Sequence, residues 1–285
     1  MAKKPTEARR DREPRSVLLT GATGGIGSEL ARQLAARGDR LLLVARKRAA
    51  LDALAAELQR SHGADVDVFA GDIAEPADRA ALVTRAEQRQ VDTLINNAAQ
   101  PGFGAIDAID DATIARVLTV NLVAPLQLTR AMIAPLSRRP AATILNMGSA
   151  LGHIGVPGFA IYCATKFGLR GATEALRREL AESSIRVVSI SPRTTRTSFN
   201  DEATERFNQA TGTASDTPQA VVRAVVRQLD GRAIDRVLGF PEKLFAKINA
   251  LVPGMVDGGF GRHRRALADL RHGAPAPAER AALDS

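Results

Sequence analysis

The only tyrosine in the chain, Tyr162, stands four residues before Lys166. Residues at this spacing share one face of a helix, so a helix beginning near Gly158 would set the phenol beside the ammonium group. A free phenol has a pKa near ~10 and is a poor base at neutral pH, and a nearby cation favours the phenolate and lowers that pKa. The pair therefore predicts general acid–base chemistry, although an ordinary amphipathic helix surface would show the same spacing.

Ser149 lies thirteen residues before Tyr162, at the end of the apolar segment ATILNMGS. A hydroxyl at the end of a strand could donate a hydrogen bond to a substrate oxygen and hold that oxygen beside the phenol. We therefore place Ser149 with Tyr162 and Lys166 among the candidate catalytic residues.

A second candidate site is the glycine-rich segment TGATGGIG at residues 20–27, which continues the short apolar run SVLLT. Glycines in such a loop allow a tight turn, a close approach of the backbone to a pyrophosphate, and close packing of helix on strand. The N-terminus of the following helix offers free N–H groups and a positive dipole end to the anion. A flexible turn is the alternative, but the position between the first strand and the first helix favours a phosphate-binding loop.

These candidate residues fall at the ends of apolar runs that alternate with helical patterns between residues 16 and 240. Continuous apolar runs are typical of strands buried on both faces of a parallel sheet. We expect strands at 16–20, 41–45, 65–70, 91–97, 142–149, 185–192 and 234–239, and helices after the glycine loop and at 48–61, 76–89, 111–137, 158–182 and 217–229. The predicted fold is a single α/β domain with a doubly wound parallel (Rossmann-type) sheet of about seven strands and helices on both faces.

Over residues 16–240 the sequence resembles the short-chain dehydrogenase/reductase family in its compact single-domain form. The resemblance rests on the T-G-x-x-x-G-x-G spacing of the glycine loop, on the serine at a strand end, and on the segment YCATK, which is similar to Y-x-A-S-K. It implies reversible interconversion of a carbonyl and an alcohol, in which a nicotinamide passes a hydride and Tyr162 passes a proton. It also implies that Lys166 holds Tyr162 and the nicotinamide ribose. Nucleotide-sugar epimerases and dehydratases usually carry T-G-x-x-G-x-x-G and a longer substrate domain, which this sequence lacks.

The end of the second predicted strand indicates which nicotinamide cofactor binds. An acidic residue there usually accepts hydrogen bonds from the ribose of NAD, whereas an arginine accommodates the 2′-phosphate of NADP. This strand ends in Arg46, Lys47 and Arg48, with no carboxylate. A planar guanidinium can bind phosphate through two hydrogen bonds, so Arg46 is the first candidate. A solvated helical turn is the alternative, and we expect NADP(H) rather than NAD(H).

The resemblance assigns further residues to the cofactor. Asp72 and Ile73 match positions that contact the adenine, and Asn97 matches the second Asn of N-N-A-G, close to the ribose. Thr197 matches a threonine that binds the nicotinamide carboxamide. The predicted cofactor-binding residues are therefore Gly21, Thr23, Gly24, Gly25, Ile26, Gly27, Arg46, Asp72, Ile73, Asn97, Tyr162, Lys166 and Thr197. Asn121 is the fourth candidate catalytic residue, because it matches an asparagine that binds a water linking the lysine to solvent; an unremarkable polar helix residue is the alternative.

Two residues depart from the family pattern. Ala99 replaces a glycine, which requires an ordinary φ angle at this position. Arg193 also replaces a glycine, and its side chain could bring a cation to the active-site mouth or point to solvent. The mostly apolar loop 150–157 should face the substrate. His153 in this loop could contact the substrate, although a surface histidine is the simpler interpretation.

Two later segments should border the substrate. Residues 198–215 are polar with few apolar anchors, which is typical of a mobile lid. Residues 241–256 have apolar side chains at helical spacing, at Leu244, Ile248, Leu251 and Met255. We expect a helix that packs on the domain or on a partner subunit. The alternatives are an apolar wall for a lipid-like substrate and a weak membrane-surface contact.

The net charge of +8 lies mainly in the two ends of the 285-residue chain, with +3 in residues 1–15 and +2 in residues 261–285. Charged ends of this composition are usually solvated. We expect disordered tails at 1–15 and 261–285, a catalytic domain at 16–240, and an apolar C-terminal element at 241–260 that serves the substrate or a dimer. The body is only mildly basic and lacks tryptophan, which disfavours nucleic-acid binding.

Composition gives the remaining expectations. We find no signal peptide and no apolar run long enough to cross a bilayer, and the single cysteine, Cys163, fits a reducing compartment. A cytoplasmic homodimer or homotetramer with a small-molecule carbonyl or alcohol substrate and no metal site is therefore predicted. A cofactor-binding sensor on the same fold is the rival function. A sensor would be expected to lose the tyrosine–lysine pair, which this chain keeps.

Overall fold

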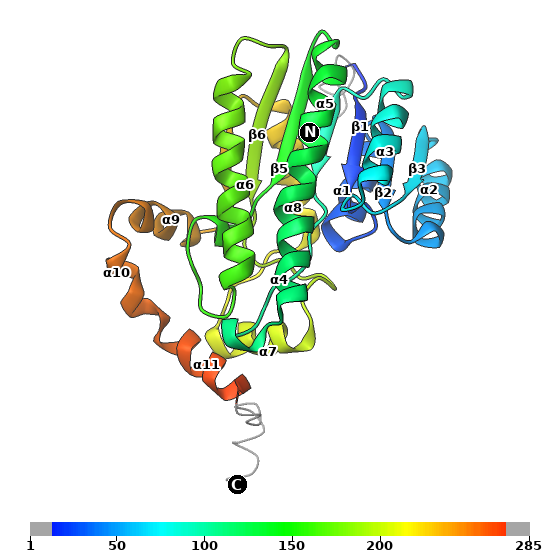
Figure 1. Ribbon diagram of the computed structural model, residues 1–285. Helices are drawn as coiled ribbons and strands as arrows, with labels where there is room; N and C mark the ends of the chain where they lie inside the picture. The colour runs from blue at the N-terminus through cyan, green and yellow to red at the C-terminus, as the bar shows by residue number, and fades with distance from the viewer. Residues whose placement is uncertain (1–12, 272–285) are drawn as a thin grey trace, which may run out of the picture.

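The computed structural model describes residues 13–271 and has the layered α/β architecture drawn in Figure 1. The strands are β1 (Ser16–Thr20), β2 (Arg40–Ala45), β3 (Val66–Ala70), β4 (Thr93–Asn96), β5 (Ala142–Met147), β6 (Ile185–Ser191) and β7 (Asp235–Val237). The α-helices are α1 (Gly25–Ala35), α2 (Arg48–His62), α3 (Pro76–Gln88), α4 (Asp111–Leu118), α5 (Ala124–Ser137), α6 (Ala160–Glu179), α7 (Glu202–Thr211), α8 (Pro218–Asp230), α9 (Glu242–Leu251), α10 (Gly254–Asp257) and α11 (Gly261–Arg271). Short helical segments are η1 (Ile106–Ala108), the π-turn η2 (Thr119–Val123), η3 (Ala150–Gly152) and η4 (Gly258–Phe260).

The strands form one parallel sheet of seven, in the order β3-β2-β1-β4-β5-β6-β7. The order reverses between β1 and β4, so the loops after these two strands diverge and leave a crevice at the carboxyl edge of the sheet. The predicted α/β class with a doubly wound sheet is confirmed.

The central strands are buried on both faces, as their continuous apolar sequences predict. In β1, Val17 and Leu19 belong to the core cluster formed with α1, α2 and α8. Leu18 belongs to the opposite cluster, formed with α3 and α5. Helices therefore cover both faces, and the sheet holds the loops at its carboxyl edge in fixed positions.

The stretch Asp111–Ser137 is one continuous helical run made of α4, the π-turn and α5. By length and composition alone it could cross a membrane, with a mean hydropathy of 1.4 in its most apolar window. In the fold, 44 % of that window is buried, and Leu128, Met132 and Leu136 pack in the core. We therefore assign it as a core helix of the domain.

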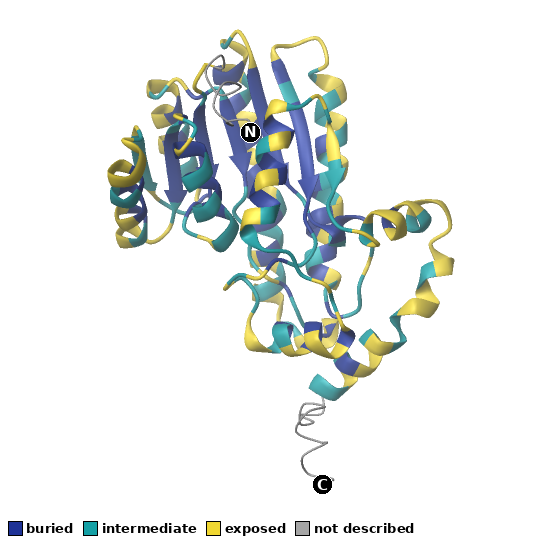
Figure 2. Ribbon diagram, turned by 180° about the vertical axis from the view of Figure 1, so that it is seen from behind, coloured by how far each residue is buried: buried dark blue, intermediate teal, exposed yellow. Residues whose placement is uncertain are grey.

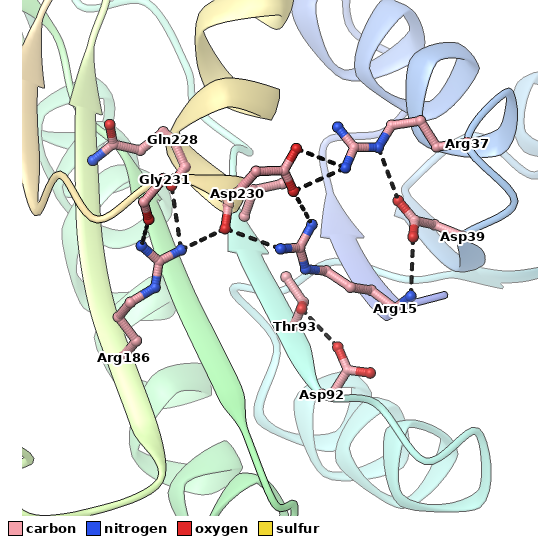
Figure 3. Close-up of polar contacts among 10 residues, drawn as sticks. Arg15, Arg37, Asp39, Asp92, Thr93, Arg186, Gln228, Asp230 and Gly231 are labelled. Carbon is pink, nitrogen blue, oxygen red and sulfur yellow. Dashed lines mark hydrogen bonds and ion pairs between the residues drawn. The ribbon is translucent and has the colours of Figure 1, made fainter. Parts of the chain in front are cut away.

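Polar contacts join several elements at the amino edge of the sheet, opposite the crevice (Figure 3). Arg15, just before β1, donates to Asp230 Oδ1 and to the carbonyl oxygen of Leu229, both at 2.9 Å. Asp230, at the end of α8, also accepts from Arg37 Nη2 at 2.8 Å. Arg186 of β6 donates to the Leu229 carbonyl oxygen at 2.7 Å. These bonds anchor the end of α8 to β1 and β6.

The structure corrects the predicted limits of both tails. Arg15 is bonded into the domain, so it does not belong to a solvated tail, and residues 1–12 lie outside the described residues. The predicted tail 261–285 begins as a helix, α11, because Ala266 and its neighbours at helical spacing pack against α7. Residues 272–285 lie outside the described residues.

We call residues 240–271 the C-terminal arm. Its first helix, α9, ends at Leu251 and does not continue to residue 256 as the apolar spacing predicts. Pro253 lacks the N–H that an uninterrupted helix needs, and the chain resumes as α10. Figure 1 shows the arm running beside the domain from α9 to α11, and Figure 2 shows that most of it is exposed.

Candidate active site

The glycine loop lies at the crevice between β1 and β4, where backbone segments come very close. Gly21 has φ +65°, and a Cβ on it would stand 2.8 Å from Ala98 Cα. A Cβ on Gly27 would overlap the carbonyl oxygen of Gly21. Gly24 caps α1 without a side-chain hydrogen bond, so N–H groups of the first turn are available to an anion. The loop therefore fits a pyrophosphate.

Thr20 and Asn97 hold the glycine loop against the end of β4. Thr20 Oγ1 accepts hydrogen bonds from the backbone N–H of Asn97 at 3.0 Å and of Ala98 at 3.1 Å. Asn97 Nδ2 donates back to the carbonyl oxygens of Thr20 and Gly21, at 3.0 and 3.2 Å. The Asn97 amide thus fixes the loop, a contact that the sequence resemblance does not reveal. Ala99 has no positive φ, as predicted.

The basic residues after β2 differ in their partners. Arg48 forms an ion pair with Asp52 at 2.9 Å. Arg46 and Lys47 are exposed, line the same cavity as the glycine loop, and form no ion pair in the part of the chain that the structure describes. The two cations left for a phosphate are therefore Arg46 and Lys47.

Asp72 and Ile73 lie at the carboxyl edge after β3 and line the cavity. Asp72 Oδ1 accepts from the N–H of Ala74 at 2.9 Å, and the Asp72 N–H donates to Asp78 at 2.7 Å. The residue that caps α3 is Glu75, so Asp72 does not serve as the cap.

The loop after β6 reaches across to the glycine loop. A Cβ on Gly25 would overlap the side chain of Thr197, so these two segments touch. Thr197 Oγ1 accepts from the N–H of Phe199 at 3.3 Å and lines the cavity. The predicted pyrophosphate loop and the predicted nicotinamide-binding threonine are thus brought together although they lie far apart in the sequence.

Tyr162 and Lys166 lie on α6, four residues apart, with Lys166 Nζ 5.6 Å from the centre of the phenol ring. Lys166 is 3 % exposed, and its Nζ donates to the carbonyl oxygen of Met147 at 2.9 Å. Ser149 follows β5, and its Oγ accepts from the N–H of Leu151 at 3.1 Å. Three of the four predicted catalytic residues, Ser149, Tyr162 and Lys166, therefore meet at the end of β5.

Desolvation decides the charge states at this site. It lowers the pKa of Lys166 from 10.5 to about 8. It raises the pKa of Tyr162 well above its ordinary value, although a hydrogen bond with Ser149 opposes the rise. The expectation that the lysine lowers the tyrosine pKa is therefore wrong for the protein without cofactor, because burial is the largest influence on the phenol and Lys166 does not offset it. The phenol is protonated at neutral pH.

Asn121 lies in the π-turn between α4 and α5, and it is buried outside the cavity lining. Its Oδ1 accepts from the N–H of Gln100 at 2.7 Å, and its Nδ2 donates to the carbonyl oxygen of Gln100 at 2.9 Å. Asn121 therefore holds the backbone just after β4. Among the described residues, Asn121 forms no hydrogen bond with Lys166.

A buried polar cluster that sequence reasoning did not assign ties β4 and β5 together. Asn96 Nδ2 donates to Asn146 Oδ1 at 2.8 Å and to Thr129 Oγ1 at 3.0 Å. Asn146 Nδ2 donates to Thr173 Oγ1 of α6 at 2.8 Å. This cluster sets the distance between α6 and the strand ends. The sequence signal that could have revealed this cluster is an asparagine near the end of each strand, Asn96 in β4 and Asn146 in β5, which pair in register.

The predicted lid, residues 198–215, is partly helical. Phe207 of α7 is fully buried and packs against Phe103, Phe159 and His263, with ring centroids 5.0, 5.8 and 5.7 Å away. The segment has few apolar anchors, as expected, but this one large ring connects α7 to the domain and to α11.

His153 and Arg193 are both held by protein partners. His153 is buried, not a surface residue, and its Nε2 lies 3.1 Å from Ser191 Oγ. Burial also lowers its pKa. Arg193 pairs with Asp216 at 2.8 Å and with Glu242 of α9 at 3.5 Å. Arg193 therefore neither points freely to solvent nor brings an uncompensated charge to the cavity.

These features surround one cavity of about 1430 Å³. It is lined by every predicted cofactor-binding residue and by Ser149. Beyond the catalytic residues its wall is mainly apolar and comes from three segments: the loop after β5, α7 with the preceding loop, and the C-terminal arm. The apolar lining includes Leu151, Ile154, Val156, Phe159, Phe199, Phe207, Phe245, Ile248, Met255, Val256 and Phe260.

Known proteins are similar to this chain in sequence and in fold. The family model described as short chain dehydrogenase matches residues 15–208. A putative ketoacyl reductase of granaticin polyketide synthesis from Streptomyces violaceoruber is 38 % identical over 67 % of this chain and 71 % of its own length.

Two solved structures have the same fold. A short-chain dehydrogenase from Sphingobium yanoikuyae in complex with NADPH has a TM-score of 0.73 and 31 % identity, covering 85 % of this chain and 96 % of that one. A bulky-bulky ketone specific alcohol dehydrogenase from Comamonas testosteroni has a TM-score of 0.72 and 28 % identity, covering 85 % and 94 %. The chain belongs to the short-chain dehydrogenase/reductase family of oxidoreductases.

Proposed function

We propose that the protein is an NADP(H)-dependent reductase that converts a bulky, mainly apolar ketone or aldehyde to the alcohol. The observation that carries the proposal is the meeting of Ser149, Tyr162 and Lys166 in a cavity whose far wall is apolar. The ketone-specific relative supports a large carbonyl substrate, and the relative in complex with NADPH supports the cofactor.

The residues present fit the cofactor. The glycine loop and the first turn of α1 would hold the pyrophosphate, Arg46 and Lys47 the 2′-phosphate, and Thr197 the nicotinamide end. When bound, the nicotinamide supplies the hydride that is added to the carbonyl carbon. NADP(H) is favoured over NAD(H) because both cations lack a carboxylate partner among the described residues.

The protein supplies the proton and fixes the substrate. The Ser149 hydroxyl donates a hydrogen bond to the carbonyl oxygen, and the Tyr162 phenol transfers its proton to that oxygen as negative charge develops there. The Lys166 ammonium stabilises the phenolate that remains. Burial raises the pKa of Tyr162, so at neutral pH the phenol carries the proton that reduction requires.

The test is NADPH oxidation by the purified protein with a graded series of ketones, from small aliphatic to fused-ring, and with 3-oxoacyl thioesters. NADH is the cofactor control. Tyr162→Phe should abolish turnover and still bind NADPH in a fluorescence titration. Binding of NADPH by the unaltered protein without turnover of any substrate would instead favour a cofactor sensor.

The size preference has its own variant. Phe260→Ala removes a ring from the distal wall of the cavity and should raise KM for bulky ketones while KM for small ketones stays unchanged. Equal effects on both would contradict the assignment of the apolar wall to the substrate. Assembly as a homodimer or homotetramer and a cytoplasmic location stay predictions.

A further inference from the structure

The C-terminal arm has one docked side and one free side. Asn249 Nδ2 of α9 donates to the carbonyl oxygen of His153 at 2.9 Å, and Ala246 is buried. Because a helix turns by about 100° per residue, these residues share a side that faces η3. At the other end of the arm, α11 packs on α7. The arm is therefore fixed to the domain at both ends.

The free side of α9 carries two large apolar side chains. Leu244 and Leu251 are 46 % and 83 % exposed, and they lie seven residues apart, which places them on one face. Phe240, Val252 and Met255, in the segments just before and just after the helix, are also exposed. Apolar groups of this size gathered on one segment indicate an interaction surface.

Basic residues border this apolar face. Lys243 and Lys247 are exposed, lie on α9 next to the leucines, and form no ion pair among residues 13–271. Arg262, Arg264 and Arg265 are exposed on α11, at the other end of the arm, and add to its positive charge without bordering the face on α9. The arm as a whole has six Lys or Arg and three Asp or Glu, and one of the acids, Glu242, already pairs with Arg193.

We propose that this free side of the arm docks the protein on the surface of an anionic lipid bilayer. The apolar side chains enter the boundary between headgroups and acyl chains, and the lysines contact the lipid phosphates. A second copy of the chain is a poorer occupant, because a twofold contact would bring two faces with the same excess of positive charge together.

The cavity opens beside this surface. Phe245 and Ile248, on the same helix as the exposed leucines, line the cavity, and Met255 both lines it and is 71 % exposed. An apolar carbonyl compound dissolved in the bilayer would therefore reach the cavity over a short apolar path. This consequence rests on the proposed function, whereas the docking itself does not.

The test is co-sedimentation of the purified full chain with vesicles of phosphatidylcholine, with and without phosphatidylglycerol. We expect binding to the anionic vesicles, weakened by high salt, and little binding to the neutral ones. Lys243→Gln/Lys247→Gln, which removes the two charges, should weaken binding roughly thirtyfold. Leu244→Glu/Leu251→Glu should weaken it by roughly tenfold or more.

The matched control is Ile106→Glu/Ile234→Glu, which changes two exposed apolar residues outside the arm and should leave vesicle binding unchanged. Circular dichroism and thermal unfolding show whether each variant is folded. Equal binding to neutral vesicles, or no vesicle binding at all, overturns the proposal. The proposal is also overturned if sedimentation velocity shows an oligomer that Leu244→Glu/Leu251→Glu dissociates while the same variant still binds vesicles. Because no readout is catalytic, failure here is distinct from failure of the proposed function.

Discussion

Lys166 Nζ of α6 donates a hydrogen bond to the main-chain carbonyl oxygen of Met147, at the end of β5, over 2.9 Å. The carbonyl group that accepts this bond belongs to the residue two positions before Ser149, the candidate catalytic serine, so the buried ammonium group lies close to the end of β5. The bond also holds the first half of α6 against the strand that presents Ser149. Lys166 thus contacts the Met147 carbonyl oxygen, which fixes its position, and lies beside the ring of Tyr162.

Replacing Lys166 should remove an electrostatic penalty on folding in the absence of cofactor, offset in part by the loss of the bond to the Met147 carbonyl oxygen. Its pKa of about 8 in the folded state lies below the unfolded value of 10.5, so the unfolded state binds the proton more tightly. The resulting penalty is complete below about pH 8 and disappears as pH rises through the window from 8 to 10.5. Lys166→Met should raise the free energy of unfolding at neutral pH by at most about 3 kcal/mol.

Denaturant unfolding at several pH values checks this, with Lys243→Met as an exposed control that should show no such effect. A gain from Lys166→Met that stays constant up to pH 10.5 would contradict the explanation.

Arg46 should matter for NADPH and Arg48 should not. Arg46 has no carboxylate partner in the described part of the chain, whereas Arg48 already pairs with Asp52. Loss of a charge-assisted contact with the 2′-phosphate in Arg46→Ala should raise the NADPH dissociation constant roughly ten- to hundredfold. Fluorescence titration with NADPH and NADH measures this. If Arg46→Ala weakens the binding of NADH as much as the binding of NADPH, the residue does not recognise the 2′-phosphate.

Asn121→Ala should cost stability as well as activity. The variant leaves the N–H and C=O groups of Gln100 without their side-chain partner, at about 1–3 kcal/mol for an unsatisfied buried group. Thr119→Ala in the same π-turn removes only a bond to the preceding turn and is the control. Urea unfolding compares the two. Unchanged stability of Asn121→Ala would mean that its contribution is limited to a solvent relay.

Arg193→Gly, which installs the residue usual in the family, should loosen the arm. It removes the pairs with Asp216 and Glu242, which are partly exposed, so the global stability loss should be only about 1 kcal/mol. The amide hydrogens of α9 should exchange faster, as followed by mass spectrometry. Arg196→Gly, an exposed change in the same loop, should leave that exchange unchanged.

The fold was predictable because its signals are local. Continuous apolar strands alternating with helical patterns require a parallel sheet covered on both faces, and the sheet order places every strand-end motif on one edge. The glycine loop and the tyrosine–lysine pair were readable for the same reason, since each depends on residues a few positions apart.

The remaining features depend on contacts between distant segments. The burial of His153 and the ion pairs of Arg193 arise where α9 returns to the loops after β5 and β6, and no spacing in the sequence reports this. The charged composition of α11 likewise conceals the few residues that pack on α7.

The sequence by itself determined the α/β class, the glycine loop and the tyrosine–lysine pair proposed for proton transfer. Only the tertiary structure decided that burial raises the pKa of Tyr162 although a lysine lies on the same helix, because desolvation depends on everything that surrounds a group. It also decided that the arm leaves Leu251 exposed, because exposure depends on which segment, if any, comes to cover a residue.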